Sequence, residues 1–398
     1  MRRALGLAAL AVGGLLCCQE AERPAWIADR AAPRPEPASL IDTPPEDLPP
    51  DLASPCGAAT VALEFVRPNL YFAIDASGSM RDDIPRADAT ATPLGAAPPL
   101  SDRYGVLSMA IQGLLERIGH RVNYGATLFP SAEATCDAGE EILALSQGDR
   151  VSSAVSGELG PVLSELMFSI NRRVPSGGTP VALALGGLAA KLRGRGSETY
   201  LFLVTDGGPN CNLAFNCGPE ACIPNIEHVS LTEELRCEAP LNCCDPSLAG
   251  PQNCLDASAS EAAVGALAQA GIRTIVIGIP GSEAYADVLD RLALAGGMAR
   301  PESPNYYRVS DAEQLVTTVG SLGLGVALSC GIELAEPPPD PSLVNVYFDG
   351  QIVPADPIDG WAFVGARTVQ LLGNACELLK TGQVLQADIV AGCPVVIR

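Results

Sequence analysis

Between residues 56 and 330, apolar runs of strand length alternate with segments of helical periodicity. This alternation constrains the fold more than any other feature of the sequence. Tyr200–Val204 is apolar at every position, and Ile272–Ile279 is apolar at most of them. A strand with no polar face is buried on both sides, as in a parallel sheet covered by helices. We therefore predict an α/β fold with a doubly wound, mostly parallel, six-stranded sheet and helices on both faces, as in Rossmann-like domains.

The expected elements follow one another in alternating order. The strands are Leu63–Ile74, Val122–Phe129, Ile142–Leu145 as a short edge strand, Tyr200–Val204, Ile272–Ile279 and Tyr306–Val309. The helices are Tyr104–Ile118, Val151–Ile170, Pro180–Leu192, Ala257–Ala270, Tyr285–Ala295 and Ala312–Leu322. After Cys330 the pattern changes, and Asp349-Gly350 between two short apolar runs is a strong hairpin signal. We expect residues 331–398 to form a small β-rich subdomain.

The first 18 residues have the composition of an export leader. Arg2 and Arg3 precede the apolar stretch Ala4–Leu16, which is too short to span a bilayer well. The following Leu15-Leu16-Cys17-Cys18 resembles a bacterial lipoprotein cleavage box and points to Cys18 as the lipidated residue, with Cys17 as the alternative. We expect an exported protein that is held at the cell envelope by a lipid anchor alone; simple secretion is the second interpretation.

Residues 19–55 contain nine prolines and have no periodic apolar pattern, which predicts a semi-rigid tether. The whole chain carries 46 acidic and 25 basic residues, for a net charge of −21. Because no basic patch is visible, nucleic acid is excluded as a partner class, and attraction to anionic lipid is disfavoured.

The cysteines are consistent with export. Apart from Cys17 and Cys18, the chain holds 12 cysteines, enough for six disulfides in an oxidising compartment. Seven fall within an expected insertion, residues 209–256: Cys211, Cys217, Cys222, Cys237, Cys243, Cys244 and Cys254. Since seven is odd, one of them needs an outside partner, and Cys136 is the candidate. The remaining expected pairs are Cys56–Cys330 and Cys376–Cys393. A metal-binding pair at Cys243-Cys244 is the alternative, which the leader and the two histidines, His120 and His228, make unattractive.

Three segments carry oxygen donors at positions where buried strands or loops end. The first is Asp75-Ala-Ser77-Gly78-Ser79, directly after an apolar strand. The others are Thr179 in a Gly-Gly-Thr-Pro loop and Asp206 in Val-Thr-Asp-Gly. Ligands of open α/β sheets bind outside the carboxyl ends of the strands, where these groups would converge. Carboxylates and hydroxyls are hard ligands that suit magnesium.

In order and spacing, these three motifs resemble the von Willebrand factor type A (VWA) domain over about residues 60–325. The resemblance implies a metal-ion-dependent adhesion site built from Asp75, Ser77, Ser79, Thr179 and Asp206. By that pattern Ser77, Ser79 and either Thr179 or Asp206 contact the cation directly, and the others act through water. An acidic side chain of a protein partner takes the sixth position. Magnesium is the expected ion, with manganese or calcium as alternatives.

Enzymatic activity is not expected. The sequence has no Gly-x-Ser-x-Gly, His-Glu-x-x-His or phosphate-loop motif, and both histidines lie outside any Ser/Asp constellation. Two acids after the first motif, Asp82 and Asp83, are expected to be solvated, with screening of the metal as the alternative. The sequence thus predicts a cell-envelope protein that binds another protein through a metal. The alternative is a disulfide-hardened structural component in which the metal only stabilises loops.

Overall fold

The computed structural model describes residues 61–62, 66–85, 102–149, 159–194, 198–218, 222, 244–245, 253–327, 329–380, 384 and 387–397. The predictions for the leader, Cys17, Cys18, the tether, Cys56, Cys237, Cys243 and His228 fall outside these residues. Within the described part of the chain, no helix has both the length and the apolar character needed to cross a membrane.

A six-stranded sheet forms the centre of the larger part of the molecule, in the order β4-β3-β2-β5-β6-β7. The strands are β2 (Asn69–Asp75), β3 (Asn123–Phe129), β4 (Glu140–Gln147), β5 (Thr199–Thr205), β6 (Ile272–Gly278) and β7 (Tyr307–Arg308). Every neighbouring pair is parallel except β3 and β4, which are antiparallel. This confirms the predicted mostly parallel sheet. Strand β2 corresponds to the predicted strand Leu63–Ile74, but it begins at Asn69, six residues later than the apolar pattern predicted.

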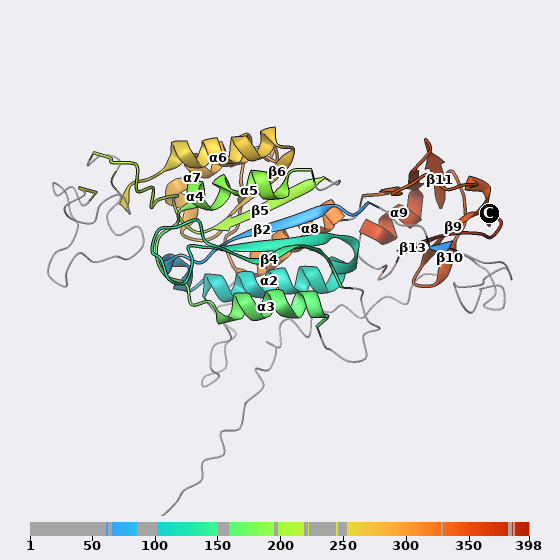
Figure 1. Cartoon of the computed structure of the whole chain (residues 1–398), viewed down its shortest axis with the longest axis horizontal. Helices are drawn as coiled ribbons and strands as arrows, with labels where there is room; N and C mark the ends of the chain where they lie inside the picture. Colours follow the sequence, from blue (N-terminus) through green and yellow to red (C-terminus); the bar gives the residue numbers. More distant parts are fainter. Residues whose placement is uncertain are drawn as a thin grey trace, which may run out of the picture. The chain divides into compact units, whose positions relative to one another are not determined.

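Helices cover both faces of this sheet (Figure 1). One face carries α2 (Arg103–Ile118), α3 (Pro161–Arg172) and α8 (Ala312–Ala327). The other carries α4 (Val181–Gly186), α5 (Leu188–Leu192), α6 (Ala257–Gln269) and α7 (Ala286–Ala295). The central strand β2 serves both layers because its side chains alternate: Leu70, Phe72 and Ile74 enter one core, and Tyr71 and Ala73 enter the other.

The topology fixes where a ligand site can form. The chain runs outward from β2 to β3 and β4, and then returns to the other side of β2 to build β5, β6 and β7. The winding direction therefore reverses between β2 and β5. Such a switch point leaves a crevice at the carboxyl ends of the strands. Asp75, the last residue of β2, and Thr205, the last residue of β5, stand at this point.

Two smaller sheets make up the C-terminal part. Their orders are β1-β13-β9-β10 and β11-β12-β8. The strands are β1 (Val61–Ala62), β8 (Gly331–Glu333), β9 (Val344–Phe348), β10 (Gln351–Val353), β11 (Trp361–Val364), β12 (Thr368–Leu371) and β13 (Ala387–Ala391), with helix α9 at Gly373–Lys380. The predicted hairpin joins β9 to β10 through Asp349 and Gly350, which both have positive φ angles. Strand β1 pairs with β13, so residues that precede the large sheet belong to a C-terminal sheet.

The cysteine pairing corrects two expectations. Cys330 is bonded to Cys376, with 5.3 Å between their Cα atoms, so neither Cys56–Cys330 nor Cys376–Cys393 forms. The reason lies in the sheet: the amide of Leu371, at the end of β12, donates to the carbonyl of Cys330 at 2.7 Å. Helix α9 begins two residues later and brings Cys376 against Cys330. Cys393 is also disulfide-bonded.

The insertion is crosslinked at several points. Cys136 is bonded to Cys211, one of the seven partners considered for it. The other described pairs are Cys217–Cys254 and Cys222–Cys244. The alternative of a metal-binding pair at Cys243-Cys244 is wrong, because the sulfur of Cys244 is in a disulfide and offers no thiolate.

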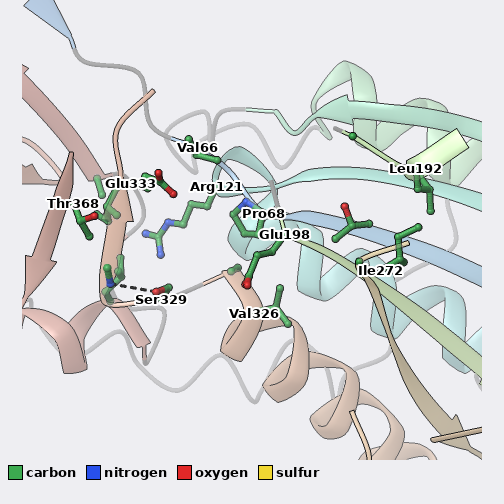
Figure 2. A pocket seen from close by; sticks show the side chains of 18 of the residues that line it. Val66, Pro68, Arg121, Leu192, Glu198, Ile272, Val326, Ser329, Glu333 and Thr368 are labelled. Carbon is green, nitrogen blue, oxygen red and sulfur yellow. Dashed lines mark hydrogen bonds between the residues drawn. The ribbon is translucent and has the colours of Figure 1, made fainter. Parts of the chain in front are cut away.

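A cavity of about 710 Å³ opens at the amino ends of the large sheet's strands (Figure 2). Glu198 and Ile272, at the beginnings of β5 and β6, contribute to its wall, as does Arg121. The Arg121 guanidinium is buried and donates to the carbonyl of Val384. Burial lowers the pKa of Arg121 to about 10, so it stays charged at neutral pH. This cavity lies at the edge of the sheet opposite Asp75 and is separate from the site described next.

Candidate metal centre

All five residues of the predicted metal site lie together at the carboxyl edge of the large sheet. Asp75 ends β2, Ser77 precedes the short 3-10 helix η2 (Gly78–Arg81), and Ser79 lies within it. Thr179 immediately precedes the turn into α4, and Asp206 follows β5. Each side chain is at least 94% buried; Ser79 is the most exposed at 6%. Burying five polar side chains at one point of a sheet costs free energy unless they find hydrogen-bonding or ionic partners inside the protein.

Hydrogen bonds join the carboxylates and serines into one network. Both oxygens of Asp75 accept protein donors: Oδ1 from the amide of Ser77 at 2.9 Å, and Oδ2 from the hydroxyl of Thr205 at 2.6 Å. The hydroxyls of Ser77 and Ser79 are 3.2 Å apart. Ser79 then donates to Oδ1 of Asp206 at 2.9 Å. The network brings the oxygen atoms of Asp75, Ser77, Ser79 and Asp206 into one small volume.

The Thr179 hydroxyl joins this group from the facing loop. A Cβ atom added to Gly207 would lie 3.7 Å from Oγ1 of Thr179 and 4.0 Å from Oγ of Ser79, so both hydroxyls face the same point of the backbone. The amide of Thr179 donates to Oδ1 of Asn210 at 2.9 Å, and the amide of Asn210 donates back to the carbonyl of Thr179 at 3.0 Å. Asn210 thus fixes the position of Thr179, a role that its place four residues after Asp206 did not reveal.

A disulfide holds the same loop from its other side. The Cys136–Cys211 bridge lies so close that a Cβ atom at Gly178 would be 2.3 Å from the sulfur of Cys211. The amide of Gly178 also donates to the carbonyl of Thr135, next to Cys136, at 2.9 Å. Glycine is therefore required at position 178. The loop that carries Thr179 is clamped between the disulfide and Asn210.

Burial dominates the electrostatics of the two carboxylates. Burial, reinforced by the neighbouring charge of Asp206, raises the pKa of Asp75 to about 7. Burial likewise raises the pKa of Asp206, although the Arg103 guanidinium works in the opposite direction. Two buried carboxylates that resist ionisation form a site where a cation is strongly favoured.

Arg103, the first residue of α2, was not identified by sequence reasoning. Its Nη1 forms an ion pair with Oδ2 of Asp206 and donates to the carbonyl of Ser79 at 3.1 Å. The same atom lies 3.4 Å from Oδ2 of Asp82, whose side chain is 41% exposed; Asp82 is thus partly solvated, as expected, and also faces this arginine. Asp83, by contrast, is exposed as expected. The helix start at Asp102-Arg103 gave no local signal that this arginine would reach Asp206.

The donor set fits a hard divalent cation. It offers two carboxylates and three hydroxyls, the oxygen ligands that magnesium, manganese and calcium accept. With both carboxylates ionised, Arg103 neutralises one negative charge and leaves one uncompensated. These residues can therefore hold a cation.

The sequence matches no protein-family model and no curated protein. Solved structures do show similarity. The pilus adhesin SpaC from Lactobacillus rhamnosus GG matches at 15% identity and a TM-score of 0.43, over 83% of this chain but 39% of the adhesin. Proximal thread matrix protein 1 from the mussel byssus, with a zinc-occupied MIDAS motif, matches at 13% identity and a TM-score of 0.35, over 69% of this chain and 49% of its own.

A third similar structure is the vWF domain of the pilus tip protein Mfa5 from Porphyromonas gingivalis. It matches at 12% identity and a TM-score of 0.39, over 67% of this chain and 97% of that domain. Likeness at these levels concerns architecture alone. The strand order, the single antiparallel edge strand and the helices on both faces give this chain a von Willebrand factor type A-like fold.

Proposed function

We propose that this protein binds another protein through a divalent cation held by Asp75, Ser77, Ser79, Thr179 and Asp206. One observation carries the proposal: at the switch point of the sheet, two buried carboxylates and three buried hydroxyls converge, and the adjacent Arg103 balances one of the two negative charges. Magnesium is the proposed ion, with manganese or calcium as alternatives.

The charge of the site suggests what the cation would capture. Among the buried groups, Asp75, Asp206 and Arg103 together contribute one negative charge, whereas the charge of Asp82 is screened by water because its side chain is 41% exposed. A bound divalent ion therefore leaves the buried centre with one positive charge. A buried centre of net positive charge attracts an anion from outside. An exposed aspartate or glutamate of a protein partner supplies that anion and completes the coordination of the ion.

The proposed location is outside the cytoplasm. Disulfides that join Cys136 to Cys211, Cys217 to Cys254, Cys222 to Cys244 and Cys330 to Cys376 support an oxidising compartment. With the sequence pattern of the leader, we propose a lipid anchor at Cys18 and a tether over residues 19–55. We also propose a VWA domain over residues 56–330, in which Val61–Ala62 pair with the C-terminal sheet, and a C-terminal β-rich domain over residues 331–398.

We propose a binding protein and not an enzyme. His120 lies in the short helix η3 (Gly119–Arg121), which precedes β3 and so stands at the amino edge of the sheet. It accepts a hydrogen bond from Nε of Arg121 at 3.1 Å. A general base must come within hydrogen-bonding reach of the reacting water, and His120 is at the wrong edge to do so.

Isothermal titration calorimetry with magnesium, followed by partner capture with and without EDTA, tests this function. We expect saturable magnesium binding that Asp75→Asn abolishes. Asp287→Asn, a change at an exposed aspartate on α7, serves as the matched control and should bind as the wild type does. The adhesion proposal is wrong if capture from an extract is the same with magnesium and with EDTA. In that case a melting temperature lowered by EDTA would favour the structural alternative.

A further inference from the structure

Arg103 is fixed at the metal centre by contacts from several segments. Its side chain is 12% exposed, and its Nη1 contacts Oδ2 of Asp206, the carbonyl of Ser79 and, at 3.4 Å, Oδ2 of Asp82. These acceptors come from the loop after β2 and the end of β5. Surface arginines commonly keep several solvated donors and contribute little. A guanidinium with three acceptors around one nitrogen atom is instead part of the site.

Gly281 shapes the place where this guanidinium lies. It follows β6 with a φ angle of 110°, in the left-handed region that favours glycine. A Cβ atom there would lie 2.9 Å from Nη1 and 3.0 Å from both Cζ and Nη2 of Arg103. The backbone at Gly281 therefore packs against the guanidinium and holds it on Asp206. Three loops at the carboxyl edge of the sheet thus converge on one arginine.

We propose that Arg103 sets the affinity of this centre for divalent cations by acting as a resident positive charge on Asp206. This inference rests on the proposed metal function. Oδ2 of Asp206 is taken by the guanidinium, so Oδ1 is the oxygen that remains for an ion. The positive charge also repels an incoming cation. Both effects weaken the binding of magnesium and leave the loaded centre with more positive charge for the partner's carboxylate.

The size of the effect follows from ordinary electrostatics. An opposite charge in direct contact shifts the pKa of a carboxylate by about 1 to 3 units, which is a factor of about 10 to 1,000 in its affinity for a proton. The positive charge of Arg103 should weaken the binding of a metal cation to the Asp206 carboxylate by a comparable factor. Removing the charge of Arg103 should therefore tighten magnesium binding about tenfold or more.

Titration calorimetry of magnesium into the metal-stripped full chain tests the inference. We expect Arg103→Gln to bind magnesium about tenfold more tightly than the wild type, and Arg103→Lys, which keeps the charge, to stay near the wild-type affinity. Arg291→Gln is the matched control, because Arg291 is half exposed on α7 and pairs with Glu261. Tightening seen equally in Arg291→Gln would overturn the inference.

A second variant keeps the test decisive if Arg103→Gln does not fold. Gly281→Ala leaves the arginine in the chain but displaces the guanidinium from Asp206, so magnesium binding should again tighten. A folded Gly281→Ala or Arg103→Gln protein that binds magnesium no more tightly than the wild type refutes the role of Arg103. A wild type that binds none of magnesium, manganese and calcium refutes the metal function itself, so the two failures are distinct.

Discussion

The disulfide between Cys136 and Cys211 should couple two measurable properties, stability and magnesium affinity. We consider the double change Cys136→Ser with Cys211→Ser. The two cysteines are 75 residues apart in sequence, and the loop-entropy relation assigns about 4.5 kcal/mol of stability to a crosslink of that length. The same relation gives about 3.4 kcal/mol for Cys222–Cys244, which are 22 residues apart. Removing that second bridge is therefore a control of similar cost.

The two double variants should differ in metal binding. Cys211 contacts Gly178 and is next to Asn210, which holds Thr179 by two hydrogen bonds. Without the bridge, the loop must be ordered when the ion binds, and fixing the backbone of one residue costs about 1–2 kcal/mol. We therefore expect magnesium affinity to fall about fivefold to thirtyfold in the Cys136/Cys211 variant. The Cys222/Cys244 bridge lies within the insertion, so its removal should leave the affinity unchanged.

Denaturant unfolding followed by circular dichroism gives the stabilities, and calorimetric titration at 10 °C gives the affinities. The low temperature keeps both variants folded, since a loss of about 4.5 kcal/mol is a large share of the stability of an ordinary domain. Equal magnesium affinity in the wild type and the Cys136/Cys211 variant would refute the idea that the bridge clamps Thr179. An equal loss of affinity in the control would show that any destabilisation produces the effect.

Two further predictions concern charge and packing. In EDTA, the free energy of unfolding should decrease as the pH rises from about 4 to 7, because the pKa of Asp75 is raised from 3.8 in the unfolded chain to about 7 in the folded one. In thermal melts, the stability of the Asp75→Asn variant should not decrease over this pH range. An unchanged decrease in the variant would contradict the raised pKa of Asp75. Gly178→Ala should destabilise the fold by about 1–3 kcal/mol, since its Cβ would overlap the sulfur of Cys211. The control Gly186→Ala has open space around its Cβ, so its free energy of unfolding in urea should stay unchanged or rise by up to about 1 kcal/mol. Equal loss of stability in the two variants would refute the packing argument.

The large sheet could be predicted from the sequence because strands buried on both faces consist of uninterrupted runs of apolar residues. Leu70, Phe72 and Ile74 pack on one side of β2 while Tyr71 and Ala73 pack on the other, which demands an uninterrupted apolar run. The positions of Asp75 and Asp206 followed from the same reasoning, since parallel strands end at one edge. Strand limits were less accurate: β2 begins at Asn69, and the described residues 66–68 directly before it, Val-Arg-Pro, are outside the sheet although the apolar pattern included them.

What the sequence could not provide are contacts between segments far apart in the chain. Cys330 pairs with Cys376 because β12 returns beside β8, and β1 pairs with β13 across more than 300 residues; neither pairing has a local signature. Arg103 reaches Asp206 only through the packing of α2 beside the end of β5. Both kinds of contact depend on the assembled fold, and so they become visible in the structure alone.

The arrangement around the ion also bears on where partner specificity would arise. A cation with one unbalanced positive charge attracts any carboxylate, so the centre supplies binding energy without distinguishing one acidic partner from another. The Cys-rich insertion starts and ends beside that centre: the amide of Asp256 donates to the carbonyl of Pro209 at 2.7 Å, and Cys217 is bonded to Cys254. Its two ends thus meet three residues after Asp206. On the proposed function, a partner whose carboxylate reaches the ion comes close to these two ends, and surface complementarity there decides which acidic protein is retained.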